Sequence, residues 1–311
     1  MRVTANTFTD GLITQLNQLS TRQNRYQLQA ATGQRVTLPE DDPVAMRRVL
    51  SLQAEGKTSA QHQDNIARQQ ELSNASFNAI KGIKTVSNRA REIAIAADSL
   101  KSPDELKLYG KEVTELIKQA VQAANTKNRG DYLFAGTKSD QPPFVVTVDG
   151  NNVVTGVTYQ GNTDVAQSEI ISGVTLGVQS IGENTSGSGP RGLITDSRVG
   201  ADFLNHLVEL QNHLLAGDAN SVATIDRVTL AKDEDNLLYH IGSNGAVQAN
   251  LEATHSSLKQ RSEDVQALVS REVDADFAQT LLHLNQTQTA YQAALQSAGK
   301  VLGTSLLDYL R

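Results

Sequence analysis

Residues 277–302 read FAQTLLHLNQTQTAYQAALQSAGKVL, in which apolar side chains recur at alternating steps of four and three. This spacing is the heptad of a coiled coil, in which one face of a helix packs along a partner helix. Polar Gln288 interrupts the pattern once. The residues of the predicted seam are Phe277, Leu281, Leu284, Tyr291, Leu295, Ala298 and Leu302.

Both ends of the chain are poor in charge. Residues 277–311 carry three formally charged side chains and residues 1–30 carry four. A helix with a solvated outer face normally carries Lys, Glu and Arg there, whereas uncharged polar side chains can pack against protein without stranding a charge. We therefore expect both ends to form an assembly surface. Its residues are Phe8, Leu12, Leu16, Leu19, Tyr26, Phe277, Leu281, Leu284, Tyr291, Leu295, Leu302 and Leu306.

The heptad does not identify the partner of the C-terminal helix. One interpretation is an intramolecular coiled coil between the N- and C-terminal helices. The other is a tail that becomes ordered on meeting neighbouring molecules, because ordering it costs more backbone entropy than burial of its seam returns. Both interpretations stay open from the sequence.

Glycine and proline divide the chain into three parts. Eleven of the 22 glycines lie between Gly130 and Gly192, and no proline follows Pro190. Since these residues are the strongest helix breakers, the flanks are predicted to be helical and the middle is not. The predicted fold is mainly α, a long helical rod or coiled-coil bundle formed by the N- and C-terminal segments, with a small inserted β-domain.

Local signals mark where the first helices begin and end. Asp42 before Pro43 predicts an N-cap, and the helix that follows can run to about Leu100. Residues 102–105 (SPDE) have the pattern of a capping box that opens a second helix. Basic residues and a glycine at 127–130 predict its end.

The middle segment changes to the period of a β-strand. Residues 144–148 and 153–155 flank a turn-forming DGNN sequence and predict a β-hairpin. Helices are expected again after Ser197, and Asp218 can cap the next one. Further short strands are predicted at 157–159, 169–171 and 174–176.

Composition argues against several classes of function. The net charge of −6 gives no basic surface for nucleic acid, and without cysteine there is neither a disulfide framework nor thiolate chemistry. No stretch approaches the roughly 18 apolar residues of a membrane span, so no membrane insertion is expected. The N-terminus lacks the apolar run of a cleavable signal peptide, so any export is expected to use another route.

Motifs that suggest catalytic, metal or cofactor sites have simpler explanations. Residues 187–192 (GSGPRG) match a dinucleotide fingerprint, but no βαβ unit surrounds them, so a re-entry loop is favoured. His206 and His213 are seven residues apart, whereas a zinc-binding helix needs a four-residue step. A helix cap explains residues 41–42, and a solvated helix face explains residues 233–235 (DED). We therefore expect no enzyme activity, no cofactor and no bound metal.

The order of short motifs along the chain is distinctive. They are residues 33–36 (GQRV), 39–45 (PEDDPVA), 130–137 (GDYLFAGT), 142–144 (PPF), 284–295 (LNQTQTAYQAAL) and 305–310 (SLLDYL). In this order they resemble the flagellin superfamily, and the DDPVA form is similar to its hook-associated protein 3 branch, the hook–filament junction proteins.

The resemblance implies a structural subunit of the bacterial flagellum that joins the hook-associated region to the flagellin filament. It implies an inner-tube domain of residues 1–32 with 277–311, a helical bundle of 33–135 with 193–276, and an outer β-domain of 136–192. The implied partners are further copies in a ring, the other hook-associated junction protein, flagellin and a cytosolic export chaperone. Export through the flagellar type III apparatus would place the protein outside the cell without a cleavable signal peptide.

A segment of the second predicted helix is similar to one that flagellins use between neighbouring subunits. Carried over, this makes Arg89, Arg91 and Glu92 candidate subunit contacts, whereas the simpler interpretation is a solvated helix face. Two other functions stay open: a minor flagellin that polymerises within the filament, and a cytosolic coiled-coil interaction module.

Overall fold

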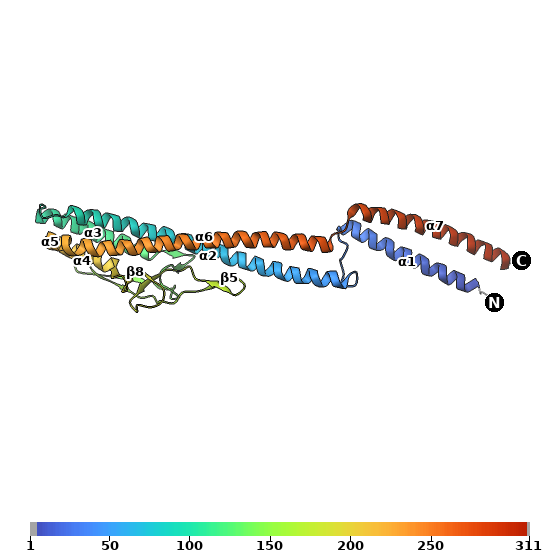
Figure 1. The fold of residues 1–311 in the computed structure, drawn as a ribbon, viewed down its shortest axis with the longest axis horizontal. Coiled ribbons are helices and arrows are strands. Elements are labelled where there is room, and N and C mark those ends of the chain that lie inside the picture. The colour runs from blue at the N-terminus through green and yellow to red at the C-terminus, as the bar shows by residue number, and fades with distance from the viewer. Residues whose placement is uncertain (1–4, 310–311) are drawn as a thin grey trace. The chain divides into compact units, whose positions relative to one another are not determined.

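A computed structural model describes the backbone of residues 5–309 and the side chains of residues 10–300. The chain divides into two compact units, one formed by Met1–Thr58 with Gln260–Arg311 and the other by Ser59–Lys259. Long helices dominate both units and confirm the predicted mainly α fold with an inserted β-rich part (Figure 1). The helices are α1 (Ala5–Thr32), α2 (Pro43–Ala96), α3 (Pro103–Ala124), α4 (Phe203–Ala216), α5 (Ala219–Ser221), the π-helix η1 (Val222–Asp226), α6 (Arg227–Val273) and α7 (Phe277–Tyr309).

Side-chain caps fix the starts of α2 and α3 where the sequence predicts them. Asp42 Oδ1 accepts hydrogen bonds from the N–H groups of Val44 at 3.2 Å and Ala45 at 3.0 Å. At α3, Ser102 Oγ accepts from the Glu105 N–H at 3.3 Å, and the Glu105 carboxylate accepts from the Ser102 N–H at 2.8 Å. This reciprocal pair is the predicted capping box, which satisfies N–H groups that the helix itself leaves free.

Two helix boundaries differ from the expected ones. Helix α2 ends at Ala96 and not near Leu100, whose side chain is 90% exposed in the turn before α3. Helix α4 begins at Phe203 because the backbone first turns at Gly200, with a φ of 64°, and then adds a short strand to the sheet. Only after that strand can the helix begin.

The β-rich part consists of short strands in four small sheets. The predicted hairpin is present as an antiparallel pair, and its turn is held by Asp149 Oδ1, which accepts from the N–H groups of Asn151 and Val153 at 2.9 and 2.8 Å. The strands are β1 (Lys127–Asn128), β2 (Asp131–Tyr132), β3 (Phe144–Val148), β4 (Val154–Tyr159), β5 (Ser168–Ile171), β6 (Val174–Leu176), β7 (Ile181–Asn184), β8 (Gly192–Asp196) and β9 (Ala201–Asp202).

The core of the Ser59–Lys259 unit lies between α2, α3, α4 and the part of α6 that belongs to this unit. The β3–β4 hairpin attaches to it through Phe144 and Val154, which are 4% and 0% exposed. Burying one large aliphatic or aromatic side chain contributes about 1.5–3 kcal/mol, so this core is the main stabilising element of the unit. Its largest fully buried side chains include Ile80, Ile83, Ile93, Leu106, Ile117, Phe134 and Phe203.

Of residues 233–235, only Asp235 lies on the solvated helix face that the sequence predicts for all three. The Asp233 side chain is 0% exposed, accepts a hydrogen bond from the Asp202 N–H at 2.9 Å and pairs with His206. The Glu234 side chain is only 17% exposed. The prediction was wrong for Asp233 because the groups that satisfy its carboxylate come from distant segments of the chain, which a local charge pattern does not reveal.

Candidate assembly surface

Helices α1 and α7 lie side by side within their unit (Figure 1). Half-buried residues of α1 recur at steps of four and three and face α7. They are Leu12, Leu16, Leu19, Gln23 and Tyr26. The Tyr26 ring stacks on the His283 ring with centroids 5.5 Å apart. The two ends of one chain therefore form an intramolecular coiled coil, which was one of the two interpretations of the heptad.

The buried seam of α7 is rotated relative to the predicted one. Thr280, Thr287 and Ala298 are 5%, 8% and 7% exposed, and Leu284 and Tyr291 are half-buried beside them. The threonine hydroxyls donate to carbonyls one turn earlier, at 2.8 Å for Thr280 and 2.7 Å for Thr287. Because these hydroxyls are satisfied within the helix, the small side chains can face α1 closely without leaving an unpaired polar group.

This rotation leaves large apolar side chains of α7 on its surface. Phe277, Leu281 and Leu295 are 57%, 38% and 46% exposed, and together they form what we call the outer strip. On α1, Ile13 and Leu28 are 50% and 49% exposed. Apolar groups that keep a helical spacing but face outward form a candidate surface for another protein.

The remaining residues of the predicted assembly surface divide into two groups. Leu12, Leu16, Leu19, Tyr26, Leu284 and Tyr291 lie partly buried in the seam between α1 and α7. The side chains of Phe8, Leu302 and Leu306 lie outside the described side chains.

Backbone hydrogen bonds join the segment after α1 to the end of α6. The Arg35 N–H donates to the Val273 carbonyl at 2.6 Å, and the Ala275 N–H donates to the Gly33 carbonyl at 2.8 Å. Arg35 also donates through Nη2 to the Glu272 carbonyl at 2.9 Å. The GQRV motif thus fixes where the terminal helix pair begins, and Gly33 is needed there because its φ is 72°.

The two aspartates of the PEDDPVA motif serve the loop and the helix start. Asp41 Oδ2 accepts from Leu38 N–H at 3.0 Å and Thr37 N–H at 3.1 Å, and these bonds lower its pKa. A backbone hydrogen bond from Ala45 likewise lowers the pKa of Asp42. Both carboxylates stay ionised, and both accept hydrogen bonds from the backbone. Within the described side chains, no group of three or more His, Asp or Glu residues is arranged to hold a metal ion.

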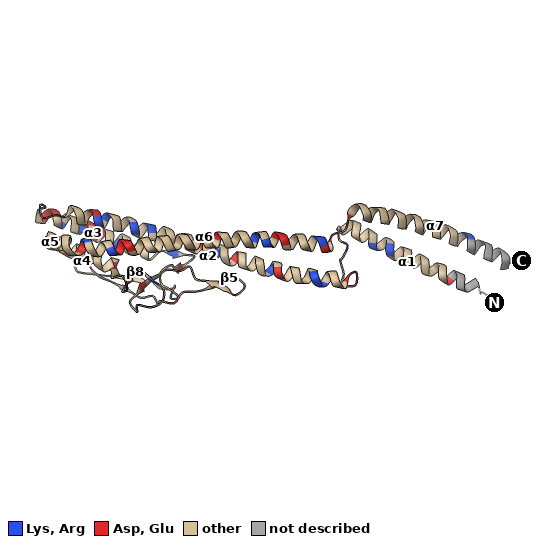
Figure 2. Cartoon of the chain, viewed as in Figure 1, with Lys and Arg blue, Asp and Glu red and all other residues tan. Residues whose placement is uncertain are grey.

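Few charges interrupt the terminal helices (Figure 2). Among the described side chains of α1 and α7, the formally charged ones are Asp10, Arg22, Arg25 and Lys300. Arg25 pairs with Asp41 at 3.6 Å. A surface this poor in charge can be covered by protein at a small desolvation cost.

The charged residues proposed as subunit contacts on α2 have partners within the chain. Arg89 pairs with Glu112 of α3 at 2.7 Å and with Glu92 at 3.0 Å, and these bonds raise its pKa. Arg91 pairs with Glu234 of α6. These side chains tie α2 to α3 and α6, and a role between subunits stays a prediction.

The histidines of α4 pair with carboxylates. His206 Nδ1 lies 2.8 Å from Asp233 Oδ2, and His213 Nδ1 lies 2.9 Å from Asp226 Oδ2. Both aspartate side chains are 0% exposed, and burial raises the pKa of each. The two histidines are seven residues apart, and so are the two aspartates, Asp226 and Asp233. This shared spacing is a signal in the sequence from which the two pairs could have been predicted.

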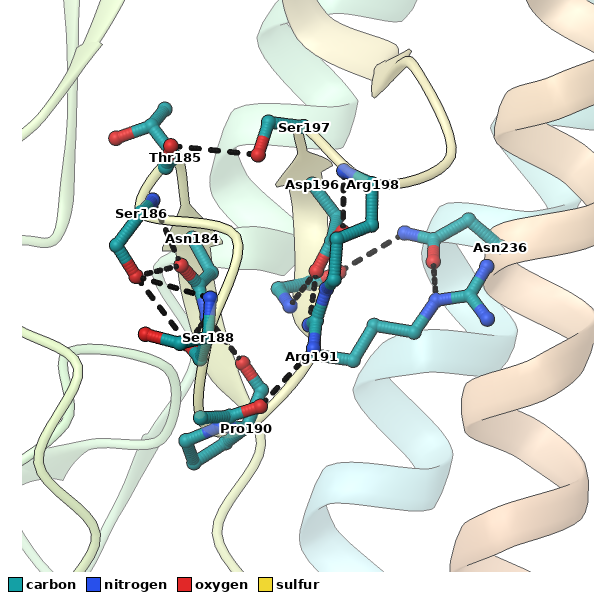
Figure 3. Close-up of polar contacts among 12 residues, drawn as sticks. Asn184, Thr185, Ser186, Ser188, Pro190, Arg191, Asp196, Ser197, Arg198 and Asn236 are labelled. Carbon is teal, nitrogen blue, oxygen red and sulfur yellow. Dashed lines mark hydrogen bonds and ion pairs between the residues drawn. The ribbon is translucent and has the colours of Figure 1, made fainter.

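The GSGPRG loop between β7 and β8 has no nucleotide-binding geometry, because β8 and not a helix follows it. Figure 3 shows how the loop is held. Asn184 Nδ2 donates to the carbonyls of Ser188 at 2.7 Å and Pro190 at 2.6 Å. Buried Asp196 pairs with Arg198 at 2.6 Å. These contacts belong to the β-rich part itself and explain the loop as structural.

No helix within residues 5–309 combines the length and apolar character needed to cross a membrane. The structure defines a mainly α protein whose helices α1 and α7 pair with each other and whose middle carries a small β-rich insertion. No family model matches the chain.

The chain is similar to flagellar hook-associated protein 3, which confirms the resemblance indicated by its motifs. It is 24% identical to the Escherichia coli protein over 291 residues, which cover 91% of this chain and 92% of that one. It is 25% identical to the Salmonella typhimurium protein over 305 residues, which cover 91% of each. This similarity indicates a structural protein of the bacterial flagellum.

Solved structures share the fold. A flagellar hook-associated protein from Vibrio parahaemolyticus matches with a TM-score of 0.64 at 18% identity, over 75% of this chain and 100% of that one. Bacillus cereus FlgL matches with a TM-score of 0.55 at 19% identity, over 70% of this chain and 97% of that one.

Proposed function

We propose that this chain is a junction subunit that joins the hook-associated region of the flagellum to the flagellin filament and assembles through its terminal helices. The observation that carries the proposal is the outer strip, Phe277, Leu281 and Leu295, on a helix pair with few charges. The similarity of the chain to hook-associated protein 3 indicates where in the flagellum it would assemble.

The outer strip supports assembly because covering it releases free energy. Burial of each large apolar side chain contributes up to about 1.5–3 kcal/mol, and part of that gain is still available at half-exposed positions. On α7, the seam within one chain fully buries only the small residues Thr280, Thr287 and Ala298 and buries its larger residues in part, and it therefore contributes less. Neighbouring subunits would complete the packing, and the terminal helices would become more rigid as they do so.

The partners follow from this place of assembly. Further copies form a ring, the other hook-associated junction protein lies on one side and flagellin on the other. A cytosolic chaperone covers the apolar helices before export through the type III apparatus, which needs no cleavable signal peptide. In this arrangement residues 1–32 with 277–311 line the tube, residues 33–135 with 193–276 surround them, and residues 136–192 face outward.

Loss of the gene in its flagellated host tests the proposal. Without a junction subunit, cells keep their hooks, lack filaments and release flagellin monomers into the medium, all of which electron microscopy and blots of the supernatant measure. Filaments of ordinary length in the deletion strain would identify a minor flagellin. Retention of the protein inside wild-type cells would identify a cytosolic coiled-coil module.

Removal of residues 277–311 tests the mechanism in the same strain. The Ser59–Lys259 unit keeps its own core, so the shortened chain should remain soluble and helical by circular dichroism. It should fail to restore filaments. Filaments of normal number would contradict assembly through the terminal helices.

A further inference from the structure

Beyond the main core of the Ser59–Lys259 unit, helices α2 and α6 meet through mostly polar side chains. Asn244 of α6 donates through Nδ2 to the Ser73 carbonyl at 3.2 Å and accepts from Ser73 Oγ at 3.1 Å. The buried side chains of α2 between residues 59 and 76 are Ser59, His62, Ile66, Ser73 and Ser76. Ile66 is the one large apolar side chain among them. Because a helix pair is held mainly by its apolar seam, this stretch is weakly held by the two helices alone.

Polar atoms without partners weaken the same stretch of α2 further. Gln63 Nε2, Gln69 Oε1 and Ser76 Oγ are buried and form no hydrogen bond with the described residues. A buried polar atom that gives up its water without gaining a protein partner opposes the packing around it. The two helices therefore need another element to stay together here.

A segment of the β-rich part covers this stretch. Ile170 of β5 is 3% exposed, and Val178, which follows β6, is 6% exposed. They form a cluster with Ile66 of α2 and Leu251 of α6 that is separate from the main core. Residues 168–178, which we call the strap, thus supply half of the fully buried apolar side chains of this cluster.

Few polar contacts hold the strap on the helices. Asn65 Nδ2 of α2 donates to the Glu169 carbonyl at 2.7 Å, which is the one hydrogen bond between strap and helix in the part of the chain that the structure describes. Ile171, next to buried Ile170, faces outward and is 39% exposed. The strap is therefore attached mainly by two apolar side chains, and it can detach while the main core stays intact.

We propose that the strap holds α2 and α6 together over this stretch and that its release opens both helices there as one cooperative unit. When the strap lifts, Ile66 and Leu251 lose two of the four members of their cluster, and a polar seam remains. Such an opening breaks fewer contacts than global unfolding and therefore occurs more often. This inference concerns the free chain and goes beyond the proposed junction role, on which it does not depend.

Hydrogen exchange of the full-length monomer tests the strap through two neighbouring substitutions. Ile170→Ser removes a buried apolar side chain, so amides of residues 59–72, 168–178 and 247–258 should all exchange at least about tenfold faster, by a common factor. Ile171→Ser makes the same change at the exposed neighbour and should leave all three segments within about threefold of wild type. Mass spectrometry of peptides measures the rates. Faster exchange in residues 168–178 alone would overturn the inference, because the strap would then rest on the helices without holding them.

A milder variant gives a second measurement that leaves the apolar cluster intact. Asn65→Asp keeps the size of the side chain but removes the N–H donor to the Glu169 carbonyl, so the three segments should exchange about fivefold faster together. Asn74→Asp is the matched control on α2, because exposed Asn74 uses its side-chain oxygen as an acceptor and keeps it. If Ile170→Ser unfolds the whole unit, Asn65→Asp decides by the same criterion. Exchange of residues 247–258 that does not follow that of the strap would overturn the inference.

Discussion

His206 and Asp233 bind across two helices, α4 and α6, in the interior of the Ser59–Lys259 unit. When the Asp233 carboxylate is ionised it only accepts hydrogen bonds, so His206 Nδ1 is then the donor. Burial lowers the pKa of His206, but the hydrogen bond and the charge of Asp233 outweigh it and leave the pKa above its ordinary value of 6.5. A second pair, His213 with Asp226, repeats this contact one heptad further on.

Replacing Asp233 should reverse the direction of the pKa shift of His206. In Asp233→Asn the charge is lost while burial remains, so the pKa of His206 should fall below 6.5. An NMR titration of the imidazole Cε1–H resonances measures it. Asp235→Asn removes the same charge from an exposed position of the same helix and should leave the titration unchanged. An unaltered His206 pKa in Asp233→Asn would show that the pair does not govern it.

The same pair gives a pH-dependent contribution to stability. Since the folded pKa of His206 is raised, its contribution is fully present below 6.5 and is lost as the pH rises through the folded value. Wild type should exceed His206→Gln by about 1–3 kcal/mol in free energy of unfolding at pH 6.5, and the difference should shrink toward alkaline pH. Urea unfolding measures it, with His255→Gln as the control. A difference that grows with pH would refute the assignment.

At the scale of the element, short-range signals in the sequence were sufficient for caps and turns. The Ser102–Glu105 box and the Asp149 turn are satisfied by atoms within a few residues, so their sequence pattern determines them. The parallel pairing of β7 with β8 was not predictable in this way, because it depends on how the intervening loop folds back. No local periodicity records that contact.

The orientation of α7 shows a different limit of sequence reasoning. A heptad drawn through the largest apolar residues places Phe277, Leu281 and Leu295 in the seam, and they lie outside it. Thr280 and Thr287 occupy the seam because their hydroxyls bond within the helix and their small size allows close packing. The seam was therefore predicted on the correct helix, with part of its residues assigned to the wrong face, and the assembly role of these residues stays a prediction.

Polar substitution of the outer strip should separate folding from assembly. Leu281→Ser/Leu295→Ser changes two partly exposed side chains, so the free energy of unfolding of the monomer should fall by no more than about 1 kcal/mol. Filament number should fall strongly, because the surface that neighbours cover has become polar. Counting filaments and measuring urea unfolding tests both parts. Leu238→Ser, at a 49% exposed position of α6, is the matched control. Normal filaments would exclude the outer strip from assembly.

At the scale of the whole molecule, the two units differ in how much they bury. The Ser59–Lys259 unit buries large side chains from several helices and a β-hairpin around one core. The terminal helices have one narrow seam in which larger residues are only partly buried, and they keep Phe277, Leu281 and Leu295 outside it. The first part therefore has its own core to fold around, and we expect the second to gain packing from neighbours in the proposed assembly.

Amide hydrogen exchange should record this division directly. Helix α3 has fully buried positions along its length, among them Val113, Ile117 and Ala124, so its amides should exchange only on global unfolding of that unit. The seam of α7 is thin, so amides of α1 and α7 should exchange far faster in the monomer and become protected in assembled flagella. Mass spectrometry of peptides from both preparations measures this. Equal protection of α3 and α7 in the monomer would mean that the terminal helices need no neighbours to become rigid, and assembly would then have to depend on contacts elsewhere in the chain.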